Sequence, residues 1–201
     1  LAQPGVWAFW WPRFQRAARW FVDTLTAEAQ AGHDKPLATE ISGSLEMTAP
    51  FAPFTLKATA DRIDKDANGD LVLIDYKTGA APTSKQVLAG YSPQLPLEGL
   101  IAQAGKFEGV AAASVAGMEY WKISGRDPAG EILPVKAEAP GVLAVARKRL
   151  DELVAIFDQA GTPYRSLPRP EWAPRYSDYE LLARLGEWTP QDDDGEGEDV
   201  S

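Results

Sequence analysis

The sequence predicts a mixed α/β domain with a central sheet, and three observations support this prediction. An amphipathic helical pattern opens the chain, three strand-like segments follow it, and helical and strand patterns then alternate. The 201 residues are 45% apolar, which is enough for one domain with a substantial core and hardly enough for two. We therefore expect one domain over residues 1–190, with a three-strand meander in a sheet flanked by helices.

The first helix is expected over residues 11–31, because apolar side chains recur there at helical spacing between Pro12 and Gly32. Three strands are expected over residues 38–48, 54–64 and 71–77. The pair Asn68-Gly69 is typical of a tight hairpin and joins the second strand to the third. Successive strands with short connections favour an antiparallel meander.

Helical and strand patterns alternate in the second half of the chain. Residues 83–104 have helical character despite two internal prolines, with Thr83 or Ser84 as a cap and Gly105 as a stop. The remaining elements are expected as a strand near residues 112–123, a long helix over about 142–159 and a short helix near 179–185. The predicted order is αβββαβα.

The composition excludes several kinds of chemistry. The chain has no cysteine, which excludes disulfides, a Cys-ligated zinc site, an iron–sulfur cluster and a cysteine nucleophile within it. No run reaches the roughly 18 apolar residues of a membrane span, and the opening segment lacks the basic start of a signal peptide. We therefore expect a cytoplasmic protein with no membrane partner.

The net charge of −9 does not favour independent binding to nucleic acid. Six acidic residues lie in the last eleven positions, so the remaining chain carries only −3. Residues 191–201 are expected to form a solvated, disordered tail. The rest of the chain permits contact with DNA through a local basic surface without predicting it.

The segment LVLIDYK at residues 71–77 places an acid and an amine at the end of an apolar strand. Because side chains alternate along a strand, Leu71, Leu73, Asp75 and Lys77 share one face. A strand that is apolar on both faces belongs inside a sheet. There the carboxylate of Asp75 could hold a hard cation, and Lys77 could orient a water or neutralise a phosphate.

The preceding strand carries two more carboxylates, Asp61 and Asp64, in the segment ADRID. The hairpin should bring at least one of them close to Asp75, and two carboxylates at one point repel unless a proton or a cation intervenes. A divalent ion is the economical explanation. The alternative is that Asp61–Arg62 and Asp75–Lys77 are ordinary surface ion pairs, worth about 0–1 kcal/mol each.

Three segments together resemble the motifs of one nuclease family. They are ADRID at residues 60–64, LIDYKTG at 73–79 and YSPQLPL at 91–97, in the order and spacing of the RecB-like branch of the PD-(D/E)XK nucleases. The likeness is greatest to the nuclease domains of the AddB family, and it extends over residues 10–188. It implies a restriction-endonuclease-like fold and a RecB-like nuclease domain.

The resemblance also implies roles for individual residues. Asp61 and Asp75, with the carbonyl of Tyr76, would hold Mg²⁺ or Mn²⁺, while Lys77 and Gln94 would be catalytic. Asp64 is the less favoured ligand, because related nucleases often carry an apolar residue at this place. Glu40 stands where the family often has a glutamate, and it is either a support for the metal or a simple exposed acid.

Two features depart from the family pattern. Family members usually have a histidine in an upstream helix, whereas His33, the single histidine, stands in a loop-like segment. We therefore expect this chain to be the C-terminal part of a larger protein, with the histidine motif outside it. Many AddB proteins also bind an iron–sulfur cluster through four cysteines, and no such cluster can form within this chain.

The resemblance implies an exonuclease domain of a helicase–nuclease that processes double-strand breaks for recombinational repair. The expected partners are a single DNA strand from an unwound duplex end and an AddA-like helicase–nuclease subunit. No nucleotide-binding P-loop motif is present, so any motor lies outside this chain. The alternative is a non-catalytic module that keeps the nuclease scaffold and binds DNA or another subunit.

Overall fold

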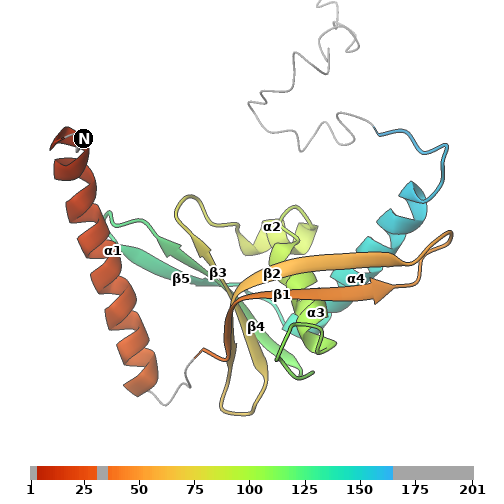
Figure 1. Ribbon diagram of the computed structural model, residues 1–201, viewed down its shortest axis with the longest axis horizontal. Helices are drawn as coiled ribbons and strands as arrows, with labels where there is room; N and C mark the ends of the chain where they lie inside the picture. The colour runs from red at the N-terminus through yellow and green to blue at the C-terminus, as the bar shows by residue number, and fades with distance from the viewer. Residues whose placement is uncertain (1–3, 31–35, 165–201) are drawn as a thin grey trace, which may run out of the picture. The chain divides into compact units, whose positions relative to one another are not determined.

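The computed structural model describes residues 4–30 and 36–164 of the chain. The chain divides into two compact units, residues 1–160 and 161–201. Every helix and strand described lies in the first unit (Figure 1). These elements are α1 (Pro4–Gln30), β1 (Ala38–Met47), β2 (Phe54–Lys65), β3 (Leu71–Lys77), α2 (Ser84–Ala89), α3 (Gln94–Gln103), β4 (Val115–Ile123), β5 (Gly130–Pro134) and α4 (Ala139–Phe157).

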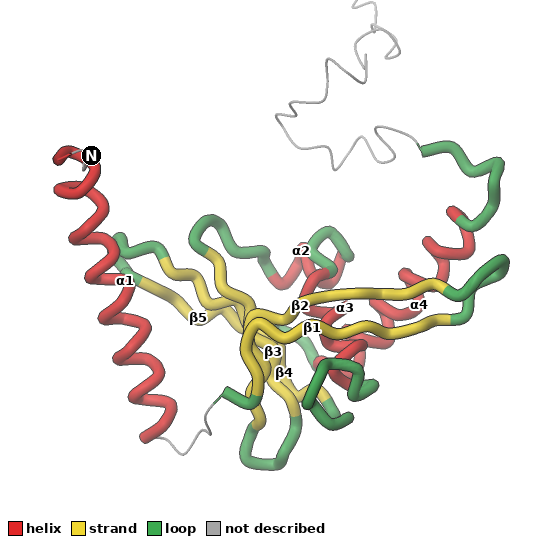
Figure 2. Tube along the Cα trace, in the orientation of Figure 1, coloured by secondary structure: helices red, strands yellow, loops and turns green. Residues whose placement is uncertain are grey.

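The five strands form one mixed sheet in the order β1-β2-β3-β4-β5. β1, β2 and β3 are antiparallel neighbours, which confirms the predicted meander. β4 pairs with β3 in parallel, and β5 pairs with β4 in the antiparallel sense. A parallel pair needs a long crossover connection, and α2 and α3 provide it here (Figure 2). The expected mixed α/β class is confirmed.

Three elements differ from the sequence prediction. The helical segment at residues 83–104 is two helices, because Gly90 adopts a left-handed conformation (φ 84°) that ends α2, and α3 starts after Pro93. Helix α1 begins at Pro4 and continues through Pro12, so the proline expected near its start lies inside it. Strand β5 was not predicted, since it has five residues and is only partly buried. The helix expected near residues 179–185 lies outside the described residues.

The main core lies between α3 and the sheet. Helix α3 contacts β1, β2, β3, β4 and α4. Its residues Leu95, Ile101 and Ala102 are fully buried against the side chains of the sheet, which include Leu71 and Leu73 of β3. The face of β3 that carries Leu71 and Leu73 is therefore the face toward α3.

Helix α1 packs on the opposite face of β3 and β4. The Phe21 ring meets Tyr76 and Trp121 edge to face at centroid distances of 5.7 and 6.1 Å. Trp20 meets Trp121 in the same manner at 6.0 Å. Tyr76 and Trp121 are register partners in the β3–β4 pair, so they lie side by side on that face.

Strands β2 and β3 diverge at Asp61. Residues 62–65 of β2 pair with β3, whereas residues 54–60 pair with β1 alone. Arg62 and Ile63 pair with both neighbouring strands. Beyond this point the last residues of β3, from Asp75 to Lys77, are paired with β4. The divergence leaves the end of β3 without a β2 partner on that side, and this is where the candidate site lies.

Within the part of the chain that the structure describes, no helix is long and apolar enough to span a membrane.

Candidate active site

Asp75 and Lys77 form an ion pair at the end of β3. Asp75 is 1% exposed, and the Lys77 ammonium lies 2.9 Å from its Oδ1 and 2.7 Å from its Oδ2. The two residues share the face of β3 toward α3, as the alternation along the strand predicted. Lys77 is partly exposed, so the pair connects the buried end of the strand to the surface.

Gln94, the first residue of α3, joins this pair. Its Nε2 donates to Oδ1 of Asp75 at 2.6 Å, and its Oε1 accepts from Nζ of Lys77 at 3.2 Å. One turn later on the helix, Glu98 accepts a second hydrogen bond from Nε2 of Gln94 at 3.1 Å. The start of α3 therefore places one amide among three charged groups.

Asp61 lies beside them, where β2 leaves β3. Its Oδ2 accepts the backbone N–H of Tyr76 at 2.9 Å. Since β3 no longer pairs with β2 at Tyr76, the aspartate side chain takes the place of a backbone partner. Asp61 is thereby held next to Asp75, and its charge acts on both Asp75 and Glu98.

Two carboxylates of this site, those of Asp75 and Glu98, have pKa values raised above their ordinary values. Burial raises the pKa of Asp75 above its usual range, and the charge of Asp61 acts in the same direction, whereas Lys77 and Gln94 oppose the shift. Burial also raises the pKa of Glu98 to about 7, with smaller contributions from the charges of Asp75 and Asp61. The site thus concentrates negative charge that a cation could relieve.

Two members of the cluster were not predicted. Glu98 is 2% exposed, and it stands as the single charge in the apolar run LPLEGLIA, four residues after Gln94. That spacing puts both on one side of a helix, which could have revealed it. Tyr120 pairs with Asp75 in the β3–β4 register, and its buried hydroxyl has no hydrogen-bond partner in the described structure. Burial raises the pKa of Tyr120, and the charges of Asp75 and Glu98 add to this.

The other residues singled out from the sequence lie elsewhere. Asp64 forms an ion pair with Arg62, and Arg62 also contacts Glu28 of α1. Asp64 therefore lies on the face of the sheet toward α1, opposite to the candidate site. Glu40 is exposed and has a left-handed backbone conformation (φ 49°). The β1–β2 pairing is interrupted there, because Glu40 and Asp61 are the two residues left unpaired in the register. His33 lies outside the described residues. The structure therefore brings Asp61, Asp75, Lys77 and Gln94 together and separates Asp64 from them, while the roles of these residues stay predictions.

The donor set can be compared with the needs of a divalent metal. Among residues 4–30 and 36–164, no three His, Asp or Glu side chains converge in a way that could hold a metal ion. Two carboxylates do lie together, Asp61 and Asp75, and Oδ2 of Asp75 accepts no hydrogen bond although Lys77 is close. Mg²⁺ is commonly held through one or two carboxylates together with water and substrate phosphates. The residues fit an ion of that kind.

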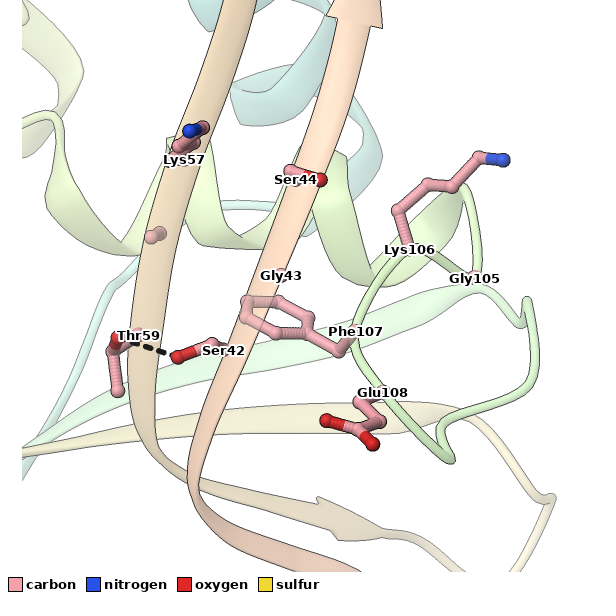
Figure 3. A pocket seen from close by; sticks show the side chains of 10 residues that line it. Ser42, Gly43, Ser44, Lys57, Thr59, Gly105, Lys106, Phe107 and Glu108 are labelled. Carbon is pink, nitrogen blue, oxygen red and sulfur yellow. Dashed lines mark hydrogen bonds between the residues drawn. The ribbon is translucent and has the colours of Figure 1, made fainter.

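One hollow of the described surface lies away from this site. It has a volume of about 950 Å³ and is formed by β1, β2 and the loop after α3 (Figure 3). Lys57 and Lys106 line it, as do Ser42 and Thr59, whose hydroxyls are 3.1 Å apart. None of the candidate catalytic residues lines this hollow. The candidate site is defined by the geometry of its side chains.

A mixed sheet flanked by helices, with two aspartates and a lysine at the ends of diverging strands, defines the class of restriction-endonuclease-like α/β proteins. Residues 4–179 match the family model of the PD-(D/E)XK nuclease superfamily. The chain belongs to this superfamily, whose members are generally nucleases that hydrolyse phosphodiesters.

Curated relatives match a shorter part of the chain. The uncharacterized protein RT0391 of Rickettsia typhi is 37% identical over 67 residues, which are 33% of this chain and 8% of that protein. An uncharacterized protein of Rickettsia bellii is 37% identical over 62 residues, or 31% of this chain and 8% of that protein. The match thus spans less than a tenth of the relatives' own length.

Among solved structures, the crystal structure of SSO0001 is 14% identical and covers 64% of this chain and 53% of its own, with a TM-score of 0.34. A similarity at this level carries no argument about the chain.

The raised pKa of Glu98 gives a test of its burial. The unfolded carboxyl ionises near its usual pKa of 4.5, and the folded one near 7, so the folded state binds more protons between these values. Stability should therefore fall as pH rises from about 4.5 to 7. Glu98→Gln cannot ionise and so removes this loss. We expect its free energy of unfolding to exceed that of wild type by about 2–3 kcal/mol at pH 8, with little difference near pH 4.5.

Urea unfolding in the presence of a chelator would measure this difference across the pH range. Asp23→Asn, which changes an exposed acid on α1, is the matched control and should show no such pH-dependent gain. A constant difference between Glu98→Gln and wild type from pH 4.5 to 8 would contradict the prediction.

Proposed function

We propose that the chain is the metal-dependent DNA nuclease domain of an AddB-like subunit, in a helicase–nuclease that processes double-strand breaks for recombinational repair. The observation that supports this most is the cluster of Asp61, Asp75, Lys77 and Gln94 at the divergence of β2 and β3. These are the positions at which the RecB-like motifs carry their metal ligands and catalytic residues.

The chemistry proposed is hydrolysis of a DNA phosphodiester. Held by Asp61, Asp75 and the carbonyl of Tyr76, Mg²⁺ or Mn²⁺ would offset phosphate charge and lower the pKa of a bound water. Lys77 would orient the attacking water and stabilise the negative charge that grows on the phosphate. Gln94 accepts a hydrogen bond from the Lys77 ammonium, so it would hold the amine in place for that role. The products would be a 3′-hydroxyl and a 5′-phosphate.

The proposed substrate is one strand of an unwound duplex end, and the proposed partner is an AddA-like helicase–nuclease subunit in the cytoplasm. The motor has no counterpart among the motifs of this chain, and the curated relatives are far longer than the matched region. A domain that receives its strand from a larger assembly does not need a strong positive field of its own, which is consistent with the net charge of −9.

A metal titration tests the proposal. We expect cleavage of single-stranded DNA by the full-length protein to require millimolar Mg²⁺ or Mn²⁺. The 201-residue chain should gain thermal stability with Mn²⁺, by at most about 2.7 kcal/mol at 100 times the dissociation constant. Asp75→Asn should lose both responses, because it removes one of the two carboxylates, whereas Asp23→Asn should keep both.

Two outcomes would count against this proposal. An equal Mn²⁺ response in wild type and Asp75→Asn would show that the ion binds elsewhere, and a chain ending at residue 190 tests whether the acidic tail is that place. A full-length protein that binds single-stranded DNA with every metal tested, and cleaves with none, would be a nuclease-like binding module.

A further inference from the structure

Glu98 contacts the proposed catalytic groups, yet the proposed reaction assigns it no role. It is a carboxylate with 2% of its surface exposed, and its hydrogen-bond donor is Nε2 of Gln94 at 3.1 Å. No lysine, arginine or histidine among the described residues forms an ion pair with it. Burying an unpaired carboxylate costs free energy, and the hydrogen bond from Gln94 offsets part of that cost.

The Gln94 amide has a partner of suitable polarity at each end. Its nitrogen donates to two carboxylates, Asp75 at 2.6 Å and Glu98 at 3.1 Å, and its oxygen accepts from the Lys77 ammonium at 3.2 Å. The reversed amide would turn its oxygen toward both carboxylates and its NH₂ group toward the ammonium. Each of these three contacts would then change from attraction to repulsion.

Glu98 contributes more to this orientation than its distance alone suggests. The charge of Asp75 is offset by Lys77, which lies 2.7 Å from Oδ2 and 2.9 Å from Oδ1 of that carboxylate. Glu98 has no such counter-ion in the described structure, so its charge acts chiefly on the Gln94 amide. Its position one helical turn after Gln94 makes this contact local to α3 and independent of the sheet.

We propose that Glu98 is a positioning residue, which fixes the Gln94 amide so that its oxygen faces Lys77 and aims the ammonium at the scissile phosphate. This inference rests on the proposed nuclease function for its effect on rate. The orientation of the amide itself does not depend on that function.

Two variants of Glu98 separate positioning from packing. Glu98→Met removes the acceptor but leaves an apolar side chain of similar length in a buried place, so we expect the fold to be retained. Glu98→Gln keeps an oxygen that can accept from Gln94. In the full-length protein with Mn²⁺ and single-stranded DNA, we expect Glu98→Met to lower kcat about tenfold with little change in KM. Glu98→Gln should recover most of the rate.

A double-mutant cycle tests whether Glu98 acts through Gln94. In a Gln94→Ala background, Glu98→Met should lower kcat by less than about twofold, because the amide that it positions is absent. If the fold reductions in kcat from Gln94→Ala and Glu98→Met multiply in the double variant, the proposal is overturned. A Glu98→Met variant with the wild-type kcat would also overturn it.

The side-chain amide of Gln94 gives a readout that needs no activity. Its ¹⁵N–¹H₂ signals can be assigned in the 201-residue chain by their loss in Gln94→Ala. The two Nε2 protons of Gln94, each hydrogen-bonded to a carboxylate, should have shifted resonances and exchange slowly with solvent. Glu98→Met should change these chemical shifts and speed the exchange. Signals unchanged in Glu98→Met would overturn the positioning role, even if the protein cleaves DNA. If Glu98→Met changes the Gln94 signals as expected but the wild-type protein cleaves no DNA, the positioning role is upheld and the nuclease function is rejected.

Discussion

Replacing Lys77 or Asp75 by alanine in the full-length protein is expected to reduce DNA cleavage about 10²–10³-fold or more, the size found when one charge-stabilising group is removed from an active site. Lys77→Ala removes the ammonium that lies against Asp75 and Gln94. Asp75→Ala removes the carboxylate that both of these side chains contact. If the proposed helicase–nuclease is the parent assembly, its ATP-driven unwinding should continue largely unchanged, because no nucleotide-binding P-loop motif lies in this chain.

Strand cleavage and unwinding would be measured on the same duplex, with labelled ends, in saturating Mg²⁺. Lys85→Ala is the matched control for Lys77→Ala, since Lys85 is an exposed lysine on α2. Asp23→Asn serves the same purpose for Asp75. Undiminished cleavage by either site variant would mean that another site cuts the DNA, and loss of unwinding as well would point to a failure of folding or assembly.

The site was largely predictable because its residues belong to short local patterns. Alternation along β3 placed Asp75 and Lys77 on one face, and the Asn68-Gly69 turn fixed which strand would lie beside it. Asp61 and Asp64 lie three residues apart on β2 and so on opposite faces of the sheet, and Asp64 lies with Arg62 on the face toward α1. The residues alone do not say which face of β2 meets Asp75, and the choice of Asp61 comes from the resemblance.

The residues that were missed depend on contacts distant in sequence. Tyr120 enters the site through the parallel β3–β4 pair, whose strands are joined by the α2–α3 crossover and not by a tight turn, so no local pattern indicates their register. Strand β5 is short and half exposed, and it depends on β4 for its pairing. The Arg62 network joins α1 to β2 across 34 residues, a separation at which charge patterns carry no pairing information.

Arg62 is the most consequential of these long-range contacts. It is 2% exposed, donates through Nε to Oδ1 of Asp64 at 2.7 Å, and reaches Glu28 of α1 at 3.2 Å. Its guanidinium lies over the Trp121 ring at 4.9 Å. Burial works against the charged form, but the hydrogen bonds with Asp64 and Tyr76 prevail and raise the pKa of Arg62 above its usual value.

Arg62→Met is therefore expected to lower the free energy of unfolding by about 3 kcal/mol, since breaking a buried ion pair leaves a carboxylate without compensation. This is the lower end of the usual cost of breaking a buried ion pair, because the side chains of Glu28 and Asp64 are 24% and 14% exposed. Urea unfolding with a constant slope would measure the loss. Arg147→Met is the matched control, because the Arg147–Asp151 pair is 43% and 46% exposed and should contribute well under about 1 kcal/mol.

A second substitution tests the cause of that loss. If the uncompensated carboxylate is responsible, Arg62→Met combined with Asp64→Leu should recover much of the stability, since an apolar replacement of a whole buried ion pair is often neutral. A double variant no more stable than Arg62→Met would assign the loss to the guanidinium's packing on Trp121 instead. Arg62 directly follows Asp61 on β2, so loosening this contact should also disturb the site on the opposite face. We accordingly expect Arg62→Met to weaken the Mn²⁺-induced thermal stabilisation, an effect that Arg147→Met should not show.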